Sequence, residues 1–127
     1  MEILLVDDNP DFLTPLKEEL YKRGYVVYTA GDGVEATNIL SATSVDAIIS
    51  DIKMPRVDGI KLHQWVRSLK RYATTTFVFI SGYQDEYTNT LDLNAERDFF
   101  LDKTMTLEEI LRFIDRLVFG KFADAWM

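Results

Sequence analysis

Residues 45–50 read VDAIIS, an apolar run that ends against Asp51. The same arrangement occurs at residues 3–6, ILLV, which lead into two aspartates, and at residues 77–80, FVFI, which lead into a serine. Two further apolar runs occupy residues 25–30 and 99–101. Continuous apolar runs of this length are typical of strands that are buried on both faces, as in a parallel sheet. The sequence therefore predicts five buried strands.

Stretches with helical periodicity separate these strands. Asn9-Pro10 has the form of a helix cap followed by proline at the first helical position. Pro15 falls inside this first helix, so we expect either a kink or a start near Thr14. The other expected helices are residues 34–42, 60–72, 86–94 with weak periodicity, and 107–118, where the apolar spacing is clearest.

The alternation of strands and helices predicts a (βα)₅ chain. Right-handed crossovers place helices on both faces of such a sheet. We therefore expect a doubly wound α/β fold, with a five-stranded parallel sheet in the flavodoxin-like order 2-1-3-4-5. Residues 1–120 are expected to form one domain, and residues 121–127 an extension of the last helix or a tail.

Composition excludes several classes of function. The formal net charge of −7 argues against direct electrostatic binding of nucleic acid, which needs clustered lysine and arginine. The chain contains no cysteine, so disulfides, thiolate zinc sites and thiol nucleophiles are excluded. Because the sequence has no run of about eighteen apolar residues and no signal-peptide pattern, we expect no membrane segment and a cytoplasmic location.

Polar residues stand where the expected strands end. Asp7 and Asp8 follow the first strand, Asp51 the third, Ser81 the fourth and Lys103 the fifth. The carboxyl ends of parallel strands share one edge of the sheet, which is where ligands bind in this class of fold. Carboxylates crowded together raise one another's pKa, and a divalent cation with hard oxygen ligands relieves that conflict. The pattern favours a Mg²⁺ site.

Four pieces of this pattern resemble the receiver domain of two-component response regulators. They are VDD at 6–8, DIKMPRVDG at 51–59, FISG at 79–82 and FFLDK at 99–103. Their agreement in spacing and strand context makes the resemblance specific, and it covers almost the whole chain. It implies a phosphorylation-activated signalling switch rather than an enzyme with an outside substrate, one that catalyses only its own phosphorylation and dephosphorylation.

The resemblance also implies a role for each site residue. Asp51 is expected to be the phosphoacceptor that attacks a phosphohistidine. Asp8 is expected to bind Mg²⁺ directly and Asp7 through water, while Asp51 and the backbone carbonyl of Lys53 complete the protein ligands. Gly59 is expected to supply the turn into the third helix.

Three further residues complete the expected site and switch. The Lys103 ammonium should pair with one phosphoryl oxygen, and the Ser81 hydroxyl should bond to another. Recruitment of Ser81 should then let Phe100 turn inward, which is a two-state switch biased by new charge. Because threonine follows the lysine where the family usually has proline, we expect a trans peptide between Lys103 and Thr104.

The expected partners are proteins. A sensor histidine kinase or a histidine phosphotransfer protein should donate the phosphoryl group, and a downstream protein should bind the face made by the fourth helix, fifth strand and fifth helix. Phe113 is expected to be an exposed docking contact on that face, without a symmetric dimer. His63, the only histidine, is expected to be exposed and inert. The chain is either a free-standing regulator or the receiver of a larger protein.

Three other functions compete with this interpretation. An FMN carrier of the same strand order would need a phosphate loop where Asp7 and Asp8 would repel a phosphate. An aspartyl-phosphate hydrolase would need its nucleophile in a DxD motif on the first strand and a capping insertion. A degenerate receiver that acts only by docking would not need the complete set of acidic residues with Ser81 and Lys103.

Overall fold

The five strands form one parallel sheet in the predicted order. The computed structural model describes residues 1–54, 56, 58–82 and 96–126, with the backbone alone for residues 118–126. The sheet order is β2-β1-β3-β4-β5, and every neighbouring pair is parallel. The strands are β1 (Glu2–Val6), β2 (Val26–Ala30), β3 (Ala47–Asp51), β4 (Thr76–Ser81) and β5 (Asp98–Asp102). The predicted fold class is confirmed.

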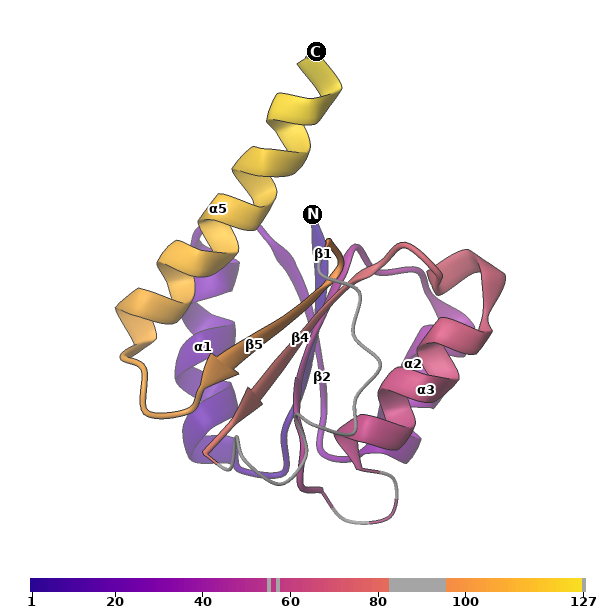
Figure 1. Cartoon of the computed structure of the whole chain (residues 1–127). Coiled ribbons are helices and arrows are strands. Elements are labelled where there is room, and N and C mark those ends of the chain that lie inside the picture. Colours follow the sequence, from indigo (N-terminus) through magenta and orange to yellow (C-terminus); the bar gives the residue numbers. More distant parts are fainter. Residues whose placement is uncertain (55, 57, 83–95, 127) are drawn as a thin grey trace.

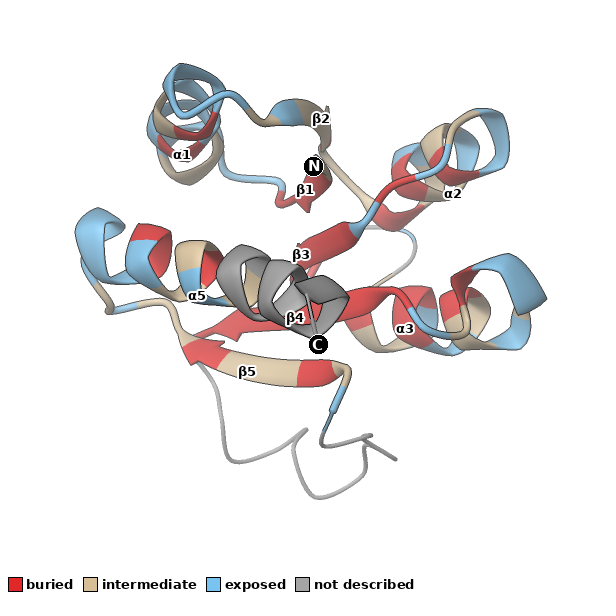
Figure 2. Ribbon diagram, turned by 90° about the horizontal axis from the view of Figure 1, so that it is seen from above, coloured by how far each residue is buried: buried red, intermediate tan, exposed pale blue. Residues whose placement is uncertain are grey.

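Helices cover both faces of this sheet. They are α1 (Pro10–Lys22), α2 (Gly33–Ala42), α3 (Gly59–Ser68) and α5 (Leu107–Trp126). Figures 1 and 2 show α1 and α5 on one face, and α2 and α3 on the other. The remaining expected helix, residues 86–94, lies outside the described residues. Within the part of the chain that the structure describes, no helix is both long and apolar enough to cross a membrane.

Two apolar cores result from this layering, because side chains along a strand alternate between the two faces. On β1, Leu4 and Val6 pack toward α2 and α3, whereas Ile3 and Leu5 pack toward α1 and α5. All four are at most 1% exposed. The sheet is therefore buried on both faces along its central strands, which explains the continuous apolar runs of the sequence.

The first helix begins at Pro10, so the alternative start near Thr14 is wrong. The side chain of Asn9 caps it by accepting a hydrogen bond from the backbone nitrogen of Asp11 at 3.0 Å. Pro15 lies inside the helix on its exposed side. There solvent can bond to the carbonyl oxygen that the proline ring leaves without an intrahelical donor, while Leu16 anchors the buried side.

The third helix is shorter than the predicted range of residues 60–72. It ends at Ser68, Leu69 takes an extended conformation, and a 3₁₀ turn spans Lys70–Tyr72. The cause is Tyr72, whose ring is buried and whose hydroxyl lies 2.5 Å from the carbonyl oxygen of Leu40. A continuous helix would not direct that hydroxyl toward the end of α2.

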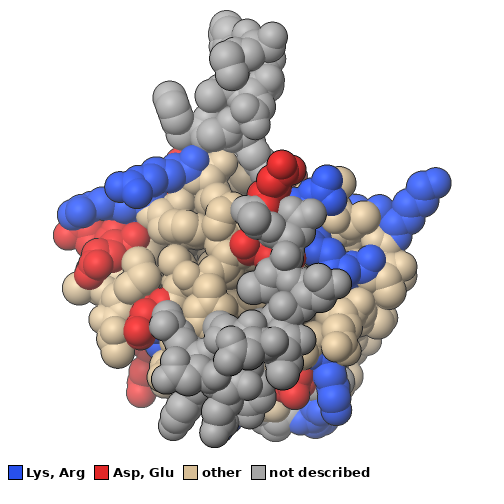
Figure 3. Space-filling model, in the orientation of Figure 1, with Lys and Arg blue, Asp and Glu red and all other residues tan. Residues whose placement is uncertain are grey.

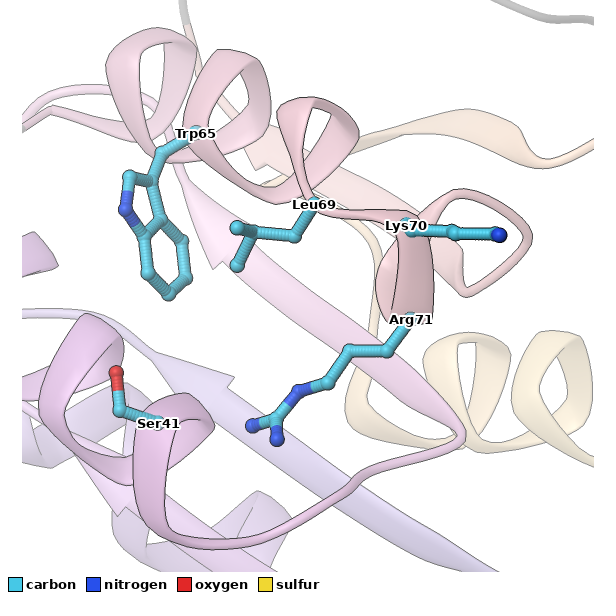
Figure 4. Close-up of a pocket in the computed structure, with 5 residues that line it drawn as sticks. All are labelled: Ser41, Trp65, Leu69, Lys70 and Arg71. Atoms are coloured by element: carbon cyan, nitrogen blue, oxygen red, sulfur yellow. The ribbon is translucent and has the colours of Figure 1, made fainter.

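A surface hollow of about 440 Å³ lies beside this turn. Figure 4 shows the side chains of Trp65 and Leu69 pointing into the space between α2 and α3, with Ser41 and Arg71 on either side and Lys70 directed away. The hollow lies at the C-terminal ends of α2 and α3. These helices run antiparallel to the strands, so it is at the opposite edge of the sheet from the strand-end carboxylates.

Candidate functional site

Three carboxylates meet at the carboxyl edge of the sheet. Val6 pairs with Ser50 across β1 and β3, so Asp7 and Asp51, each one residue further, become neighbours. Asp8 joins them, and one carboxylate oxygen from each of the three lies within 4.8 Å of the others. Asp7 is 2% exposed and Asp51 9%, whereas Asp8 is open to solvent. Of the three, Asp8 is the residue most open to solvent.

Backbone donors hold the two buried carboxylates in place. One oxygen of Asp7 accepts a hydrogen bond from the backbone nitrogen of Asn9 at 2.9 Å. One oxygen of Asp51 accepts from the backbone nitrogen of Ile52 at 2.8 Å. Each carboxylate thus keeps its second oxygen directed toward the shared space, and neither has to reorganise to bind a ligand.

Lys103 bridges the two buried carboxylates. Its Nζ lies 2.9 Å from Asp7 Oδ2 and 3.2 Å from Asp51 Oδ2. The backbone nitrogen of Lys103 donates to the carbonyl oxygen of Ser81 at 3.1 Å, which ties the turn after β5 to the end of β4. The ring of Phe12, on α1, lies 5.1 Å from the same Nζ and covers the ammonium on another side.

The charges of the site are not balanced. Burial, followed by the nearby charge of Asp7, raises the pKa of Asp51, and the opposing effects of Lys103 and the Ile52 amide are smaller. Burial alone would lower the pKa of Lys103, but its bonds and charge interactions with Asp7 and Asp51 together raise it. Three carboxylates therefore face one firmly charged ammonium, an excess of negative charge that suits a divalent cation.

Ser81 and Phe100 lie close to this group on β4 and β5. Ser81 is the last residue of β4, 1% exposed, and it pairs with Asp102 across the strands. Phe100 is partly buried, with its ring centroid 6.1 Å from that of Phe79. Lys53, two residues after Asp51, has an exposed side chain. The roles assigned to these residues from the sequence stay predictions.

Gly59 is needed for close packing rather than for the predicted turn. Its φ is not in the left-handed region, and its nitrogen donates to the carbonyl oxygen of Ile52 at 2.8 Å. A Cβ at this position would lie 2.2 Å from the carbonyl oxygen of Asp51. The start of α3 thus rests directly on the backbone of Asp51. Asp58 caps the helix by accepting from the backbone nitrogen of Lys61 at 2.9 Å.

The peptide between Lys103 and Thr104 is trans, as predicted, since the described residues include no cis peptide. Thr104 holds the turn by two hydrogen bonds to one oxygen of Asp102, from its backbone nitrogen and from its hydroxyl, both 2.8 Å long. These bonds lower the pKa of Asp102. A threonine side chain therefore fixes the turn that carries Lys103.

His63 is buried, so the exposed position that the sequence predicts for it is wrong. It is 5% exposed, and its Nε2 lies 3.0 Å from Asp98 Oδ1. The sequence contains a signal for this burial, because His63 lies next to Leu62 and three residues before Val66 on the apolar side of α3. Sequence reasoning also missed Asp98, whose place at the start of a strand gave no indication of a buried ion pair.

Phe113 is also less exposed than predicted. Its side chain is partly buried against the α1–α5 core, and its ring meets that of Phe99 edge to face at 5.5 Å between centroids. The neighbouring Arg112 and Glu108 form a surface pair at 3.7 Å. Residues 119, 122 and 126, the aromatic residues further along this helix, have side chains outside the described part.

Basic side chains do not gather into one surface in the view of Figure 3. Lysine and arginine occur in separate groups at the two flanks of this face, with aspartate and glutamate beside them. This distribution agrees with the acidic net charge of −7. It does not form the continuous positive surface on which nucleic-acid binding proteins rely.

The structure is a doubly wound parallel sheet with carboxylates and a lysine at its carboxyl edge, and comparison with known proteins identifies the class to which it belongs. The profile of the response regulator receiver domain matches residues 3–115. The chain belongs to this family, whose members act in two-component signal transduction.

Individual relatives support this assignment. The chain is 36% identical over 110 residues to the sensor histidine kinase RcsC of Salmonella typhi, an alignment that covers 87% of this chain and 11% of that protein. A receiver domain of a sensor histidine kinase from Pseudomonas aeruginosa, with magnesium in its active-site cleft, superposes with a TM-score of 0.78 at 27% identity, covering 91% and 94% of the two chains. TrrA from Thermotoga maritima, in complex with Mg²⁺ and BeF, gives 0.76 at 29% identity, covering 91% and 97%.

Proposed function

We propose that the protein receives a phosphoryl group on Asp51 from a phosphohistidine and signals through the change that follows. The observation that supports this most strongly is the bridge of Lys103 between Asp7 and Asp51, with Asp8 within 4.8 Å of both. An acceptor carboxylate, a counter-charge and further hard oxygen ligands are the parts that phosphoryl transfer to a carboxylate requires.

Asp7, Asp8, Asp51 and the carbonyl of Lys53 are the residues that would hold Mg²⁺. The excess of carboxylate charge fits a divalent cation, and two structural relatives carry magnesium. When bound, the ion would supply positive charge for the phosphoryl oxygens. The proposed assignment is Asp8 as a direct ligand and Asp7 through water.

The remaining chemistry comes from the chain itself. The Asp51 oxygen that faces Lys103 attacks phosphorus, the phosphorus–nitrogen bond of the donor histidine breaks, and the imidazole leaves. Lys103 then moves its charge from the Asp51 carboxylate to a phosphoryl oxygen while it keeps its contact with Asp7. Because backbone donors already fix Asp7 and Asp51, the site contributes positioning and electrostatic stabilisation. The same residues would govern loss of the phosphoryl group to water.

The output would follow from Ser81 and Phe100. A phosphoryl oxygen bound by the Ser81 hydroxyl draws the end of β4 toward Asp51, and Phe100 on the adjacent strand turns inward. The donor would be a sensor histidine kinase or a histidine phosphotransfer protein. The downstream partner would bind the face that includes β5 and α5, where Phe99 and Phe113 contact each other.

Phosphorylation with a small donor tests this function directly. The protein is incubated with acetyl phosphate and Mg²⁺, and its intact mass is measured for wild type, Asp51→Asn and Glu18→Gln, a surface carboxylate control. Wild type and Glu18→Gln should gain one phosphoryl group, and Asp51→Asn none. Undiminished labelling of Asp51→Asn overturns the assignment of the acceptor. Failure of wild type to take up phosphate with Mg²⁺ present supports a receiver that acts only by docking.

A further inference from the structure

A second polar cluster is buried on the other side of β5 from the α1–α5 core. It consists of His63 and Arg67 on α3 and Asp98 at the start of β5. His63 Nε2 and Arg67 Nη2 lie 3.0 and 2.5 Å from the same oxygen of Asp98. The side chains of His63 and Asp98 are only 6% and 1% exposed. The chemistry of phosphoryl transfer described above makes no use of this cluster.

The cluster fixes the orientation of the His63 ring. Arg67 supplies a positive charge beside the buried carboxylate of Asp98, and it also donates to the carbonyl oxygen of Tyr72 at 2.9 Å. Because Arg67 already compensates the charge of Asp98, the main effect of the hydrogen bond between His63 and Asp98 is to restrict rotation of the imidazole between α3 and β5. A buried ring held in this way can support its neighbours.

Aromatic rings form a continuous row from His63 to Phe100. The imidazole centroid lies 5.0 Å from the ring of Phe77 and 5.1 Å from that of Phe79. The ring of Phe79 lies 6.1 Å from Phe100, with 28° between the planes. Phe79 and Phe100 are also partners in the register of β4 and β5. Phe79 is fully buried, whereas Phe100 is only partly buried.

We propose that His63 is a positioning residue of the switch. Its ring, held by Asp98, packs against Phe79 and thereby keeps Phe100 in its partly exposed position. This inference rests on the proposed function, because it takes Phe100 as the side chain that turns inward when Asp51 is phosphorylated. Arg67 and Asp98 act on Phe100 only through the imidazole.

The direction of the effect follows from close packing. Protein interiors contain few voids, so removal of the imidazole opens space beside Phe79. Phe79 can move into that space, and Phe100 then gains room to turn inward. A change that favours the inward state before phosphorylation must also tighten binding of a phosphoryl analogue, because coupling between two equilibria is reciprocal.

The test follows Phe100 itself. Wild type, His63→Ala, His63→Phe and the control Gln64→Ala are prepared with 4-fluorophenylalanine at position 100, and ¹⁹F spectra are recorded with Mg²⁺ and increasing beryllofluoride. Gln64 is the exposed neighbour of His63 on α3. In His63→Ala, the free signal should move toward the bound position, and the dissociation constant of beryllofluoride should fall about five-fold or more. His63→Phe keeps a ring but loses the bond to Asp98, so it should change the dissociation constant less than His63→Ala does and in the same direction. Gln64→Ala should stay within about two-fold of wild type.

Each other outcome has a definite meaning. A purely structural histidine would lower the thermal midpoint of His63→Ala while leaving the ¹⁹F position and the dissociation constant unchanged, and that result overturns the proposal. If His63→Ala does not fold, His63→Leu replaces it and should give a smaller shift in the same direction; no shift again overturns it. If wild type fails to bind beryllofluoride, the proposed function is contradicted. If wild type binds it and the Phe100 signal shifts, the proposed function is supported, and the comparison of the His63 variants with wild type decides whether His63 positions Phe100.

Discussion

Removal of Asp8 should stabilise the protein when no metal is present. One oxygen of Asp8 lies within 4.8 Å of one oxygen from each of Asp7 and Asp51, so three negative groups share a small volume. Coulomb's law gives at least about 0.9 kcal/mol of repulsion for each of the two pairs in a water-like dielectric. Lys103 contacts Asp7 and Asp51, so the Asp8→Ala variant keeps those ion pairs.

A smaller effect opposes this gain. Asp8 immediately precedes Asn9, the cap of α1, and a negative charge at a helix N-terminus contributes about 0.3–1 kcal/mol. The net change expected for Asp8→Ala is therefore an increase of about 1 kcal/mol in the free energy of unfolding. For a chain of this length, that corresponds to a rise of about 4 °C in the thermal midpoint.

Differential scanning calorimetry in EDTA at low ionic strength measures this change, with Glu18→Ala as the control for loss of an exposed carboxylate. Added Mg²⁺ should then stabilise wild type by about 1.4 kcal/mol at ten times its dissociation constant, and should leave Asp8→Ala unchanged. If Asp8→Ala is less stable than wild type in EDTA, the repulsion argument is wrong. A variant that is stabilised by Mg²⁺ as much as wild type would show that Asp8 is not a ligand.

Three further predictions concern the frame around the site. Gly59→Ala should lower the free energy of unfolding by about 1–3 kcal/mol in urea titrations, because the Cβ of the new alanine would collide with the carbonyl oxygen of Asp51. An unchanged urea midpoint would contradict this close contact. Burial, followed by the hydrogen bond to Asp115, raises the pKa of Tyr25 to about 12 in the folded protein. The unfolded chain therefore loses the phenol proton at lower pH, and the free energy of unfolding should fall as the pH rises from 10 to 12. In unfolding curves measured over this pH range, Tyr25→Phe should reduce that fall. Phe113→Ala should lower the free energy of unfolding by about 1–3 kcal/mol, because the Phe113 ring packs on Phe99. If thermal unfolding shows no change, Phe113 is the exposed surface residue expected from the sequence.

The fold could be predicted because its signals are local. Apolar runs that are buried on both faces identify parallel strands, and the five runs correspond to β1 to β5 within two residues at each end. Where the prediction of an element failed, a distant contact decided the outcome. Tyr72 bonds to the carbonyl oxygen of Leu40 and ends α3 early, a contact between segments that are 32 residues apart.

The carboxylates of the site could be predicted for a similar reason. Strand ends share an edge, so Asp7 and Asp51 had to be neighbours once the sheet order was known. The bridge made by Lys103 and the ion pair of His63 with Asp98 could not be predicted in this way. Both depend on how the side chains of different strands and helices pack together, and a single ion pair such as that of His63 with Asp98 leaves no periodic trace in the sequence.

Chemical trapping at Asp51 tests the central claim most directly. The protein is treated with acetyl phosphate and Mg²⁺, then with sodium borohydride, which reduces an aspartyl phosphate to homoserine. Peptide mass spectrometry locates the product. The proposed function predicts homoserine at position 51 and at no other aspartate, and none when acetyl phosphate is omitted. Phosphate uptake with homoserine at Asp7 or Asp8 instead, or with no homoserine at all, would contradict it.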